Sequence, residues 1–185
     1  MEIRTAAPNE YEAIADITVT AYVEEARRNG NADSVGDGSH FSSSYMPALR
    51  DVVGRARDAV VLVAVEENSV LGAVAYVPGP GPYAEFHDRD AAGIRMLAVA
   101  PRAQGRGVGT ALVEACFDRA KTERRARVVL HSTPWMATAG RIYPRLGFRR
   151  APERDWSPAP GVDLQGYELG LGEDQGKTPD FAAGG

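Results

Sequence analysis

Residues 96–110 read Met96-Leu97-Ala98-Val99-Ala100-Pro101-Arg102-Ala103-Gln104-Gly105-Arg106-Gly107-Val108-Gly109-Thr110, and this stretch decides the fold. It joins an apolar strand, closed by Pro101, to a helix that we expect from about Gly107 to Thr122. The glycines between them let the main chain adopt positive φ and approach a ligand closely. The unpaired N–H groups and the positive dipole end of a helix start attract anions. The turn therefore predicts a phosphate or pyrophosphate site, to which Arg102 and Arg106 add positive charge.

Two other phosphate-binding motifs do not fit the chain. The dinucleotide pattern Gly-x-Gly-x-x-Gly fails from Gly105 because Thr110 occupies its last position, and it fails from Gly107 because Leu112 does. The run from Gly176 to Thr178 resembles the end of a P-loop, but Leu171 stands where the first glycine belongs. Neither a dinucleotide fingerprint nor a P-loop is therefore expected.

The rest of the chain predicts a mixed α/β sheet in a single domain. Apolar and β-branched runs indicate strands at Glu2–Thr5, Val60–Val65, Val70–Val77, Ile94–Val99, Val128–His131, around Phe148 and at Gln165–Leu171. The residues between the second and third runs predict a hairpin. Apolar spacing predicts helices after Pro8, over Ser44–Arg57, over Gly107–Thr122 and over Thr133–Tyr143. Residues 1–171 are expected to form the domain, a loop is expected at Asn29–Ser39, and residues 172–185 are expected to be a disordered tail.

Composition excludes several classes of protein. The chain has 185 residues, of which 44% are apolar and 25% charged, as in an ordinary soluble domain. No apolar run has the length of a membrane helix, and the first residues lack the pattern of a secretory signal. Cys116 is the only cysteine, so no intrachain disulfide can form, and the His and Cys residues show no zinc-site spacing. We expect a cytoplasmic protein with no membrane contact and no metal site.

The charge is unevenly distributed along the chain. The formal net charge is −4, yet Pro101–Arg150 holds 11 Lys or Arg against 3 Asp or Glu. An acidic protein with one basic segment does not suit general nucleic-acid binding, and it suits a site for a small polyanion better. Several of these basic residues fit a solvated helix face equally well: Arg119, Lys121, Arg124, Arg125 and Arg127.

Two segments resemble the GNAT superfamily of N-acetyltransferases. The acyl-CoA motif of that family reads Gln/Arg-x-x-Gly-x-Gly/Ala, and Gln104, Gly107 and Gly109 occupy its fixed positions. The second segment, residues 139–148, reads Ala139-Gly140-Arg141-Ile142-Tyr143-Pro144-Arg145-Leu146-Gly147-Phe148 and resembles the family's Ala…Leu-Tyr…Leu-Gly-Phe ending. The two segments follow the family's order, and the resemblance covers roughly Val60–Leu171.

The resemblance implies a fold and a cofactor. The fold is a mixed, mostly antiparallel central sheet, flanked by helices and splayed where the fourth and fifth strands part. Acetyl-CoA would lie in that gap, where the backbone of Leu97, Ala98 and Val99, near a strand bulge, would pair with the pantetheine arm. The resemblance assigns the pyrophosphate to the residues of the turn: Gln104, Gly105, Arg106, Gly107, Val108, Gly109 and Thr110.

Amide formation needs a neutral amine and a protonated leaving thiol. Tyr143 matches the tyrosine that serves GNAT enzymes as general acid toward the sulfur. A phenol has an ordinary pKa of about 10 and is protonated at neutral pH, so it can donate. The alternative is that Tyr143 is an aromatic packing residue of a short helix.

The general base is less defined by the resemblance. Many GNAT enzymes carry a glutamate on the fourth strand, where this chain has Gly93. Glu85 and His87 lie just upstream and are the candidate bases, directly or through a water. Further options are Asp88, Asp90 and His131. A second departure is Met136, which replaces an asparagine that contacts the cofactor in many members.

Acceptor contacts are expected from Tyr22, Phe41, Tyr45, Trp135 and His131, with Glu24, Glu25 and Tyr83 nearby. Acidic residues there would suit a cationic amine, although aromatic residues at helix positions also fit a core. We predict an acetyl-CoA-dependent N-acyltransferase that moves an acetyl group to a primary amine of a small molecule by direct transfer in a ternary complex. Two alternatives remain open, an acyl-CoA-binding sensor without turnover and an acetyltransferase acting on a protein or peptide amine. The sequence leaves monomer and homodimer undecided.

Overall fold

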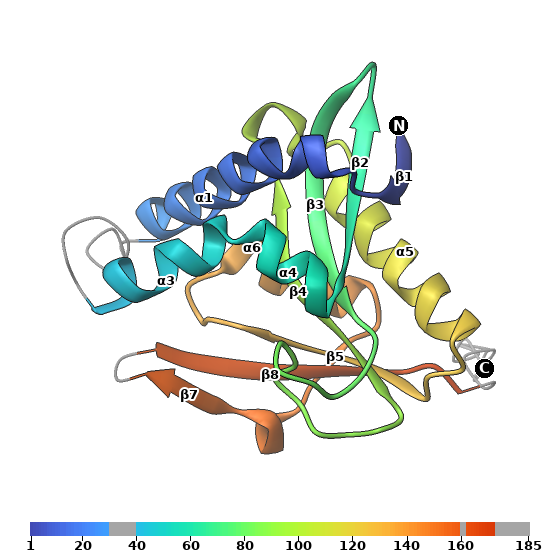
Figure 1. Cartoon of the computed structure of the whole chain (residues 1–185). Helices are drawn as coiled ribbons and strands as arrows, with labels where there is room; N and C mark the ends of the chain where they lie inside the picture. The colour runs from blue at the N-terminus through green and yellow to red at the C-terminus, as the bar shows by residue number, and fades with distance from the viewer. Residues whose placement is uncertain (30–39, 160–161, 173–185) are drawn as a thin grey trace, which may run out of the picture.

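The computed structural model describes residues 1–29, 40–159 and 162–172 (Figure 1). Its strands are β1 (Glu2–Thr5), β2 (Val60–Glu66), β3 (Ser69–Val77), β4 (Ala91–Val99), β5 (Arg127–Ser132), β6 (Arg149–Arg150), β7 (Trp156–Ala159) and β8 (Val162–Gly170). Within the described ranges these strands form one sheet in the order β1-β2-β3-β4-β5-β8-β6, and β7 pairs with β8. The β4–β5 pair is parallel and the other described pairs are antiparallel. The expected mixed, mostly antiparallel sheet is confirmed.

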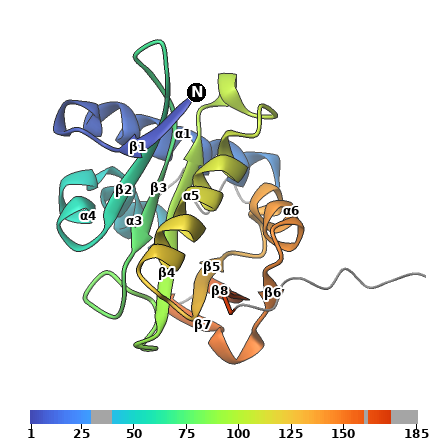
Figure 2. The same ribbon diagram turned by 90° about the vertical axis from the view of Figure 1, so that its right-hand side faces the viewer.

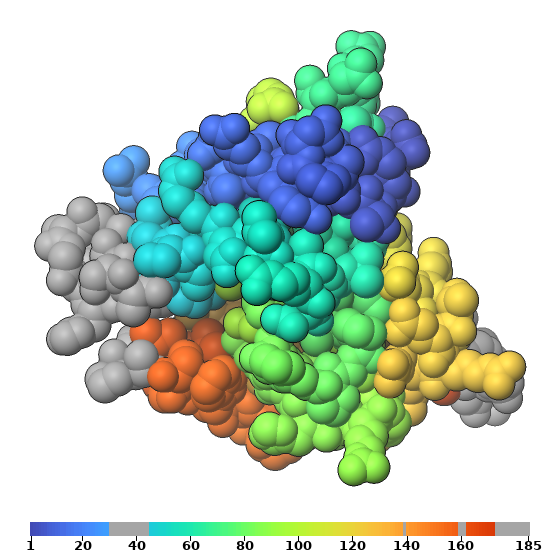
Figure 3. All heavy atoms as spheres, in the orientation of Figure 1, coloured from blue at the N-terminus to red at the C-terminus, as the bar shows by residue number. Residues whose placement is uncertain are grey.

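The helices cover both faces of this sheet. They are α1 (Tyr11–Arg28), α3 (His40–Arg50), α4 (Val52–Asp58), α5 (Val108–Thr122) and α6 (Ala137–Arg145), with short 3-10 turns η1 (Pro8–Glu10), η2 (Pro101–Ala103) and η3 (Pro152–Arg154). Helices α1, α3 and α4 lie on one side of β2, β3 and β4, and α5 lies on the other side (Figure 2). The space-filling view shows α1, α3 and α4 above, and β7 with the segment before β4 below, on one surface of the molecule (Figure 3).

Local sequence rules explain several of these elements. The hairpin expected between the second and third strands is present, and Glu67 and Asn68 form its turn with φ of 48° and 64°. Asn tolerates this left-handed conformation because its side chain can bond the local backbone. At the start of the first helical segment, the Glu10 carboxylate accepts a hydrogen bond from the Ala7 N–H at 2.7 Å. The helix therefore begins at the expected place.

Several expected boundaries are wrong, and one strand was not expected. The helix expected over Ser44–Arg57 is broken in two, because Asp51 accepts from the Gly54 N–H at 2.7 Å and thereby caps a separate α4. The helix expected from Thr133 begins at Ala137, since Thr133 to Met136 form a turn closed by the Met136 N–H and the Thr133 carbonyl. Strand β7 was not expected from its sequence, and β4 begins three residues before Ile94, at Ala91.

Strands β4 and β5 pair only along their first four residues. The parallel register runs from Ala91 with Arg127 to Ile94 with Leu130, and the two strands then separate. On its other edge β4 pairs with β3 through Ala73 with Ala98 and Ala75 with Arg95, so Met96 and Leu97 together face one residue of β3. This bulge places Met96 at a φ of 53°. The splay between the fourth and fifth strands that the resemblance implies is therefore present.

The core lies between the sheet and its helices. Leu112, Val113 and Cys116 of α5 are fully buried in this core. Burial raises the pKa of the Cys116 thiol to about 12, so this side chain packs as a small apolar group. In the described part of the chain, no helix combines the length and the apolar character that a membrane crossing requires. The expected tail beyond residue 172 and most of the expected loop at Asn29–Ser39 lie outside the described residues.

Candidate active site

The gap between β4 and β5 opens into two cavities that share Tyr22 and Met136 in their walls. The first, called here the glycine-turn cavity, has a volume of about 450 Å³. The end of β4, the glycine turn, the start of α5 and one face of α6 line it. The second, called here the aromatic cavity, has a volume of about 350 Å³. Residues of β4, β5, β7 and β8 line it, together with residues of α1 and α3. Two adjoining cavities of this kind can hold two reactants side by side.

The glycine-turn cavity collects nearly all of the residues that the sequence assigns to a pyrophosphate and pantetheine arm. Its described lining includes Leu97, Ala98, Val99, Gln104, Gly105, Gly107, Val108, Gly109 and Thr110. Gly105 and Gly107 have φ of 76° and 79°, in the left-handed region where the backbone of a residue with a side chain is strained. A Cβ added at either would meet no atom within 4 Å, so the main chain here faces open space.

The start of α5 carries free donors toward this cavity. Gly107 is the N-cap residue, and no side chain caps this end among the described residues. The first N–H of α5 bonded within the helix belongs to Ala111, which donates to the Gly107 carbonyl at 3.0 Å. The N–H groups of Val108, Gly109 and Thr110 precede it and have no acceptor within the helix. Together with the helix dipole they form a site for an anion.

The positive charge beside this site comes from other residues than the sequence indicated. The Arg106 side chain donates to Glu66 at 2.7 Å, and Arg102 donates to the Val70 carbonyl at 2.9 Å. Neither arginine lines the cavity, whereas the exposed Arg141 and Arg145 of α6 do. Sequence reasoning missed these two residues. Their signal was helical spacing, because Thr138, Arg141, Ile142 and Arg145 recur at the intervals of one helix face.

A polar contact ties α1 to α6 across the glycine-turn cavity. The buried Glu25 carboxylate accepts from the Thr138 N–H at 2.8 Å and from the Thr138 hydroxyl at 3.0 Å, which caps the first turn of α6. Arg28 donates to Glu24, to Glu25 and, at 3.4 Å, to the side chain of Gln104. Glu24 and Glu25 are therefore used within the protein, and neither lines the aromatic cavity.

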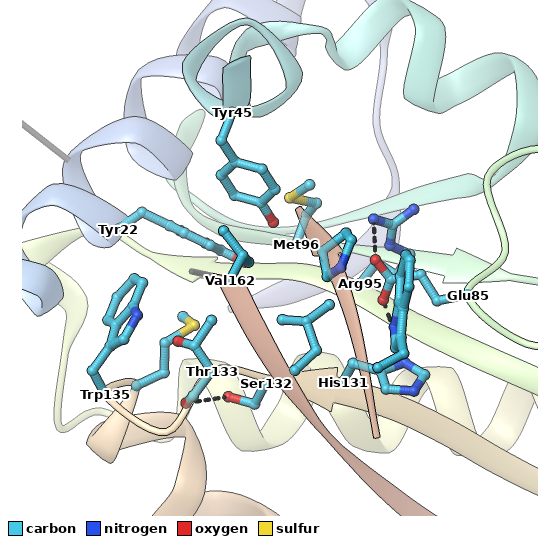
Figure 4. Close-up of a pocket in the computed structure, with 14 residues that line it drawn as sticks. Tyr22, Tyr45, Glu85, Arg95, Met96, His131, Ser132, Thr133, Trp135 and Val162 are labelled. Atoms are coloured by element: carbon cyan, nitrogen blue, oxygen red, sulfur yellow. Dashed lines mark hydrogen bonds and ion pairs between the residues drawn. The ribbon is translucent and has the colours of Figure 1, made fainter. Parts of the chain in front are cut away.

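The aromatic cavity is lined mostly by apolar groups. Of its described lining residues, the aromatic ones are Tyr22, Tyr45, Trp135 and Trp156, and the aliphatic or sulfur-containing ones are Met96, Met136, Pro158, Val162 and Leu164. Tyr22, Tyr45 and Trp135 lie on one side of the cavity, and Arg95, Glu85 and His131 lie on the other (Figure 4). Burial raises the pKa of Tyr45 to about 12 and raises that of Tyr22 well above its ordinary value, so both hydroxyls are protonated at neutral pH.

The polar side of the aromatic cavity is a connected network centred on Glu85. Arg95 donates to Glu85 Oε1 at 2.5 Å and to the Tyr83 carbonyl at 2.6 Å, and its guanidinium lies over the Tyr83 ring. His131 Nδ1 lies 3.3 Å from Glu85 Oε2. His131 Nε2 donates to the carbonyl of Arg154 at 2.9 Å, since a carbonyl can only accept. The Glu85 carboxylate is thus held between the two strands that part.

Of the other candidate bases, His131 lines the aromatic cavity beside Glu85, whereas His87, Asp88 and Asp90 do not line it. His87 is exposed and lines neither cavity. Asp88 and Asp90 are occupied by ion pairs with Arg154 and Arg127. The position of the family's strand glutamate is closed as well, because a Cβ added to Gly93 would lie 2.5 Å from the Phe86 ring.

Tyr143 lies in α6 directly after Ile142, which lines the glycine-turn cavity. The Tyr143 side chain is buried against the rings of Phe148 and Tyr167, at centroid distances of 5.8 and 5.7 Å. It does not line either of the two cavities. Burial raises the pKa of Tyr143, so its hydroxyl keeps its proton.

Of the acceptor residues expected from sequence, Tyr22, Tyr45, Trp135 and His131 line the aromatic cavity together. Phe41 belongs to α3, but its side chain lies outside what the structure describes. Trp156, on the unexpected strand β7, completes the wall, and its ring meets His131 edge-on at 6.4 Å.

The fold is similar to that of several solved structures whose descriptions name acetyltransferases. The chain is similar to PaiA N-acetyltransferase from Thermoplasma acidophilum in complex with coenzyme A, with 12% identity, a TM-score of 0.69, and coverage of 91% of this chain and 98% of that chain. It is similar to yncA from Salmonella typhimurium with acetyl-CoA, with 23% identity, a TM-score of 0.60, and coverage of 98% and 99%. Ribosomal-protein-alanine N-acetyltransferase from Brucella melitensis gives 20% identity, a TM-score of 0.63, and coverage of 92% and 100%.

Comparison with curated proteins found no match. Comparison with protein families matches residues 18–148 to the acetyltransferase (GNAT) family. That range includes both sequence segments, the splayed strands and most of the lining of the glycine-turn cavity. The chain therefore belongs to the acetyltransferase (GNAT) family.

Proposed function

We propose that this chain, as one domain over residues 1–171, transfers the acetyl group of acetyl-CoA to a primary amine of a small molecule within a ternary complex. One observation carries the proposal: two cavities, one beside an anion-binding turn and one with aromatic walls, meet at Tyr22 and Met136. A thioester bound in the first would present its carbonyl to an amine bound in the second. Relatives of the same fold bound to coenzyme A or acetyl-CoA support this assignment of the donor.

The residues around the glycine-turn cavity fit acetyl-CoA. The N–H groups at the start of α5 suit its diphosphate, and the main chain of Leu97 to Val99 runs along the splayed half of β4, where an extended pantetheine arm can pair. Arg141 and Arg145 add the positive charge that several phosphate groups require. Arg106 contributes its backbone to the turn, while its side chain stays with Glu66.

The reaction forms a C–N bond and breaks a C–S bond. The amine nitrogen attacks the thioester carbonyl, the thiolate leaves, and one proton must move from the nitrogen to a base while another reaches the sulfur. Glu85 is the base in this proposal, directly or through a water, because it is the only carboxylate among the described residues that line the aromatic cavity. Its Oε2 atom lies 3.3 Å from His131 Nδ1.

Tyr143 is the proposed general acid. Its hydroxyl is protonated because burial raises its pKa, and it follows Ile142 on the helix that borders the glycine-turn cavity. Tyr22 is the rival group, since its buried side chain lines both cavities where the two reactants would meet. Replacing each tyrosine in turn by phenylalanine shows which of the two hydroxyls is the general acid.

The proposal is tested by two measurements on the purified chain. Calorimetry with coenzyme A is expected to show saturable binding, and a thiol-release assay with acetyl-CoA and a panel of primary amines is expected to show turnover with at least one amine. Binding without thiol release from any amine or peptide would instead support the acyl-CoA sensor, which the side chain missing at Gly93 favours. Absence of binding would overturn the assignment of the donor.

A further inference from the structure

The walls of the aromatic cavity indicate what kind of acceptor it holds. Nine of its fourteen described lining residues carry aromatic, aliphatic or sulfur-containing side chains. Its volume of about 350 Å³ is at the small end of ligand cavities, which span about 300–1,000 Å³. Resting on the proposed function, we propose that the acceptor is a primary amine carried on a flat apolar body, an arylalkylamine with no second charge.

The aromatic residues form a wall that suits a planar ring. The Tyr22 and Tyr45 rings lie 6.4 Å apart at 40°, and Trp135 lies on the same side of the cavity (Figure 4). Trp156 lines the cavity from β7. Aromatic rings attract one another in tilted or edge-on geometries beyond the gain from area alone. A ring on the acceptor would bury its faces here, whereas a short alkyl amine would leave part of the wall uncovered.

The charges in the cavity are already paired, which disfavours a second ammonium group on the acceptor. Glu85 is bound by Arg95 and faces His131, and Arg95 also donates to the Tyr83 carbonyl. Glu85, Arg95 and His131 each have four-fifths or more of the side chain buried. A diamine would have to bury its second charge beside this compensated network, at a high desolvation cost.

A buried polar group in the described part of the wall is unused by the protein. The Thr133 hydroxyl is buried, lines the aromatic cavity and has no hydrogen-bond partner among the described residues. Thr133 directly follows the last residue of β5. A buried hydroxyl without a partner is costly, so a bound amine that bonds to it would gain stability. One unpaired hydroxyl and one compensated network fit an acceptor with a single amine.

The chain carries its own reporter for this cavity. It has two tryptophans in total, Trp135 and Trp156, and both line the aromatic cavity. Intrinsic tryptophan fluorescence therefore reports on this wall alone, and it does so without turnover. Measured in the presence of saturating coenzyme A, which carries no acetyl group, it gives acceptor binding independently of the transferase reaction.

The experiment compares phenethylamine, butylamine and putrescine in that fluorescence titration and in the thiol-release assay. Phenethylamine is expected to change the emission saturably and to exceed butylamine in kcat/KM by about tenfold or more, with putrescine lowest. A Trp156→Leu variant is expected to lower kcat/KM for phenethylamine about tenfold and to change that for butylamine less than threefold, at unchanged KM for acetyl-CoA.

The outcomes separate this inference from the proposed function. Butylamine or putrescine equal to phenethylamine in both assays would overturn the acceptor class and leave the transferase standing. Faster turnover of a short peptide with a free N-terminus than of any of the three amines would also overturn it, in favour of a protein substrate. Phenethylamine binding without thiol release would uphold the ligand class and overturn the transferase. No response to any of the three amines in either assay would overturn the acceptor class, while the transferase would still be decided by coenzyme A binding and the wider panel of amines.

Discussion

Glu85 Oε2 lies 3.3 Å from His131 Nδ1, across the point where β4 and β5 stop pairing. The last paired residues are Ile94 and Leu130, so Arg95 and His131 are the first residues beyond them, and Glu85 contacts both. A loop residue thereby brings a carboxylate to the start of the splay. This explains how the chain can lack a glutamate at Gly93 and still present a carboxylate to the aromatic cavity.

Glu85→Gln is expected to lower kcat about 100-fold, the usual contribution of a general base, and to leave the affinity for coenzyme A unchanged. The amide keeps the shape and can still accept from Arg95, but it cannot take a proton. Steady-state thiol release and calorimetry measure the two quantities. His87→Gln is the matched control, since His87 is exposed and lines neither cavity. Loss of kcat in the His87 variant with retention in the Glu85 variant would reverse the assignment of the base.

Tyr143→Phe is expected to lower kcat about 100-fold at unchanged coenzyme A affinity, because the ring keeps its packing against Phe148 and Tyr167 while the proton donor is lost. Burial raises the pKa of Tyr143, so the wild-type activity should show no alkaline decline from this group across the neutral range. Tyr22→Phe removes one hydroxyl from the junction of the cavities and is the comparison. A large loss with Tyr22→Phe and none with Tyr143→Phe would move the acid role to Tyr22.

Gly107→Ala is expected to weaken coenzyme A binding about tenfold or more and to destabilise the fold modestly. Its φ of 79° is left-handed, which costs an L residue about 1–2 kcal/mol, and its methyl group would project into the open space of the glycine-turn cavity. Gly81→Ala is the control, because a Cβ there also meets no atom within 4 Å and Gly81 lies outside that cavity. Calorimetry for affinity and thermal unfolding for stability separate the two effects. Equal affinity in both variants would contradict the role of the turn.

The turn was predictable from sequence because it follows from local rules, whereas the splay was expected only from the resemblance to the GNAT family. A strand closed by Pro101, glycines at 105 and 107 and an apolar helix stripe dictate strand, turn and helix almost independently of the rest of the chain. The break at Asp51 was less visible, since it depends on one capping carboxylate within a helix-forming stretch. Strand β7 offered no signal of its own, because its pairing depends on β8.

The charged residues show where local reasoning fails. Arg106 adjoins the turn in sequence, yet Glu66, 40 residues earlier, takes its side chain. Arg141 and Arg145 are far from the turn in sequence, and the fold places them beside it on α6, whose first turn is bound to Glu25 of α1. Glu85 was one of several acidic or histidine candidates until the sheet register placed His131 next to it. Which charges pair is a property of the tertiary fold, so no spacing rule could select among them.

Arg145→Ala and Arg141→Ala are each expected to weaken coenzyme A binding about tenfold, on the order of 1.4 kcal/mol, and to reduce its salt dependence. Both arginines line the glycine-turn cavity and suit phosphate groups. Arg106→Ala is expected to have a smaller effect, because its guanidinium is paired with Glu66 outside the cavity. Calorimetry at two ionic strengths measures the affinity of each variant for coenzyme A and its salt dependence. A larger effect from Arg106 than from Arg141 or Arg145 would restore the assignment made from sequence alone.

Asp88→Asn tests the ion pair between Asp88 and Arg154, the residue whose carbonyl accepts a hydrogen bond from His131. Arg154 binds both oxygens of Asp88 at 2.8 and 3.0 Å, and its own carbonyl accepts from His131. Arg154 holds the pKa of Asp88 below its usual range, so the stabilisation is complete above the ordinary Asp value and is lost as pH falls through the lowered one. The variant is expected to unfold more easily by about 1 kcal/mol near neutral pH and to converge with the wild type in strong acid.

Denaturant unfolding across that pH range measures the effect, and Asp118→Asn, an exposed site on α5, serves as the control. If the Asp88 variant stays less stable than the wild type by the same free energy of unfolding in strong acid, the asparagine disturbs packing. A lost ion pair cannot matter once the wild-type carboxylate is itself protonated. A deficit of equal size in the Asp118 variant would assign the effect to net charge. Convergence in acid confined to Asp88→Asn would place the stabilisation in the contact with Arg154.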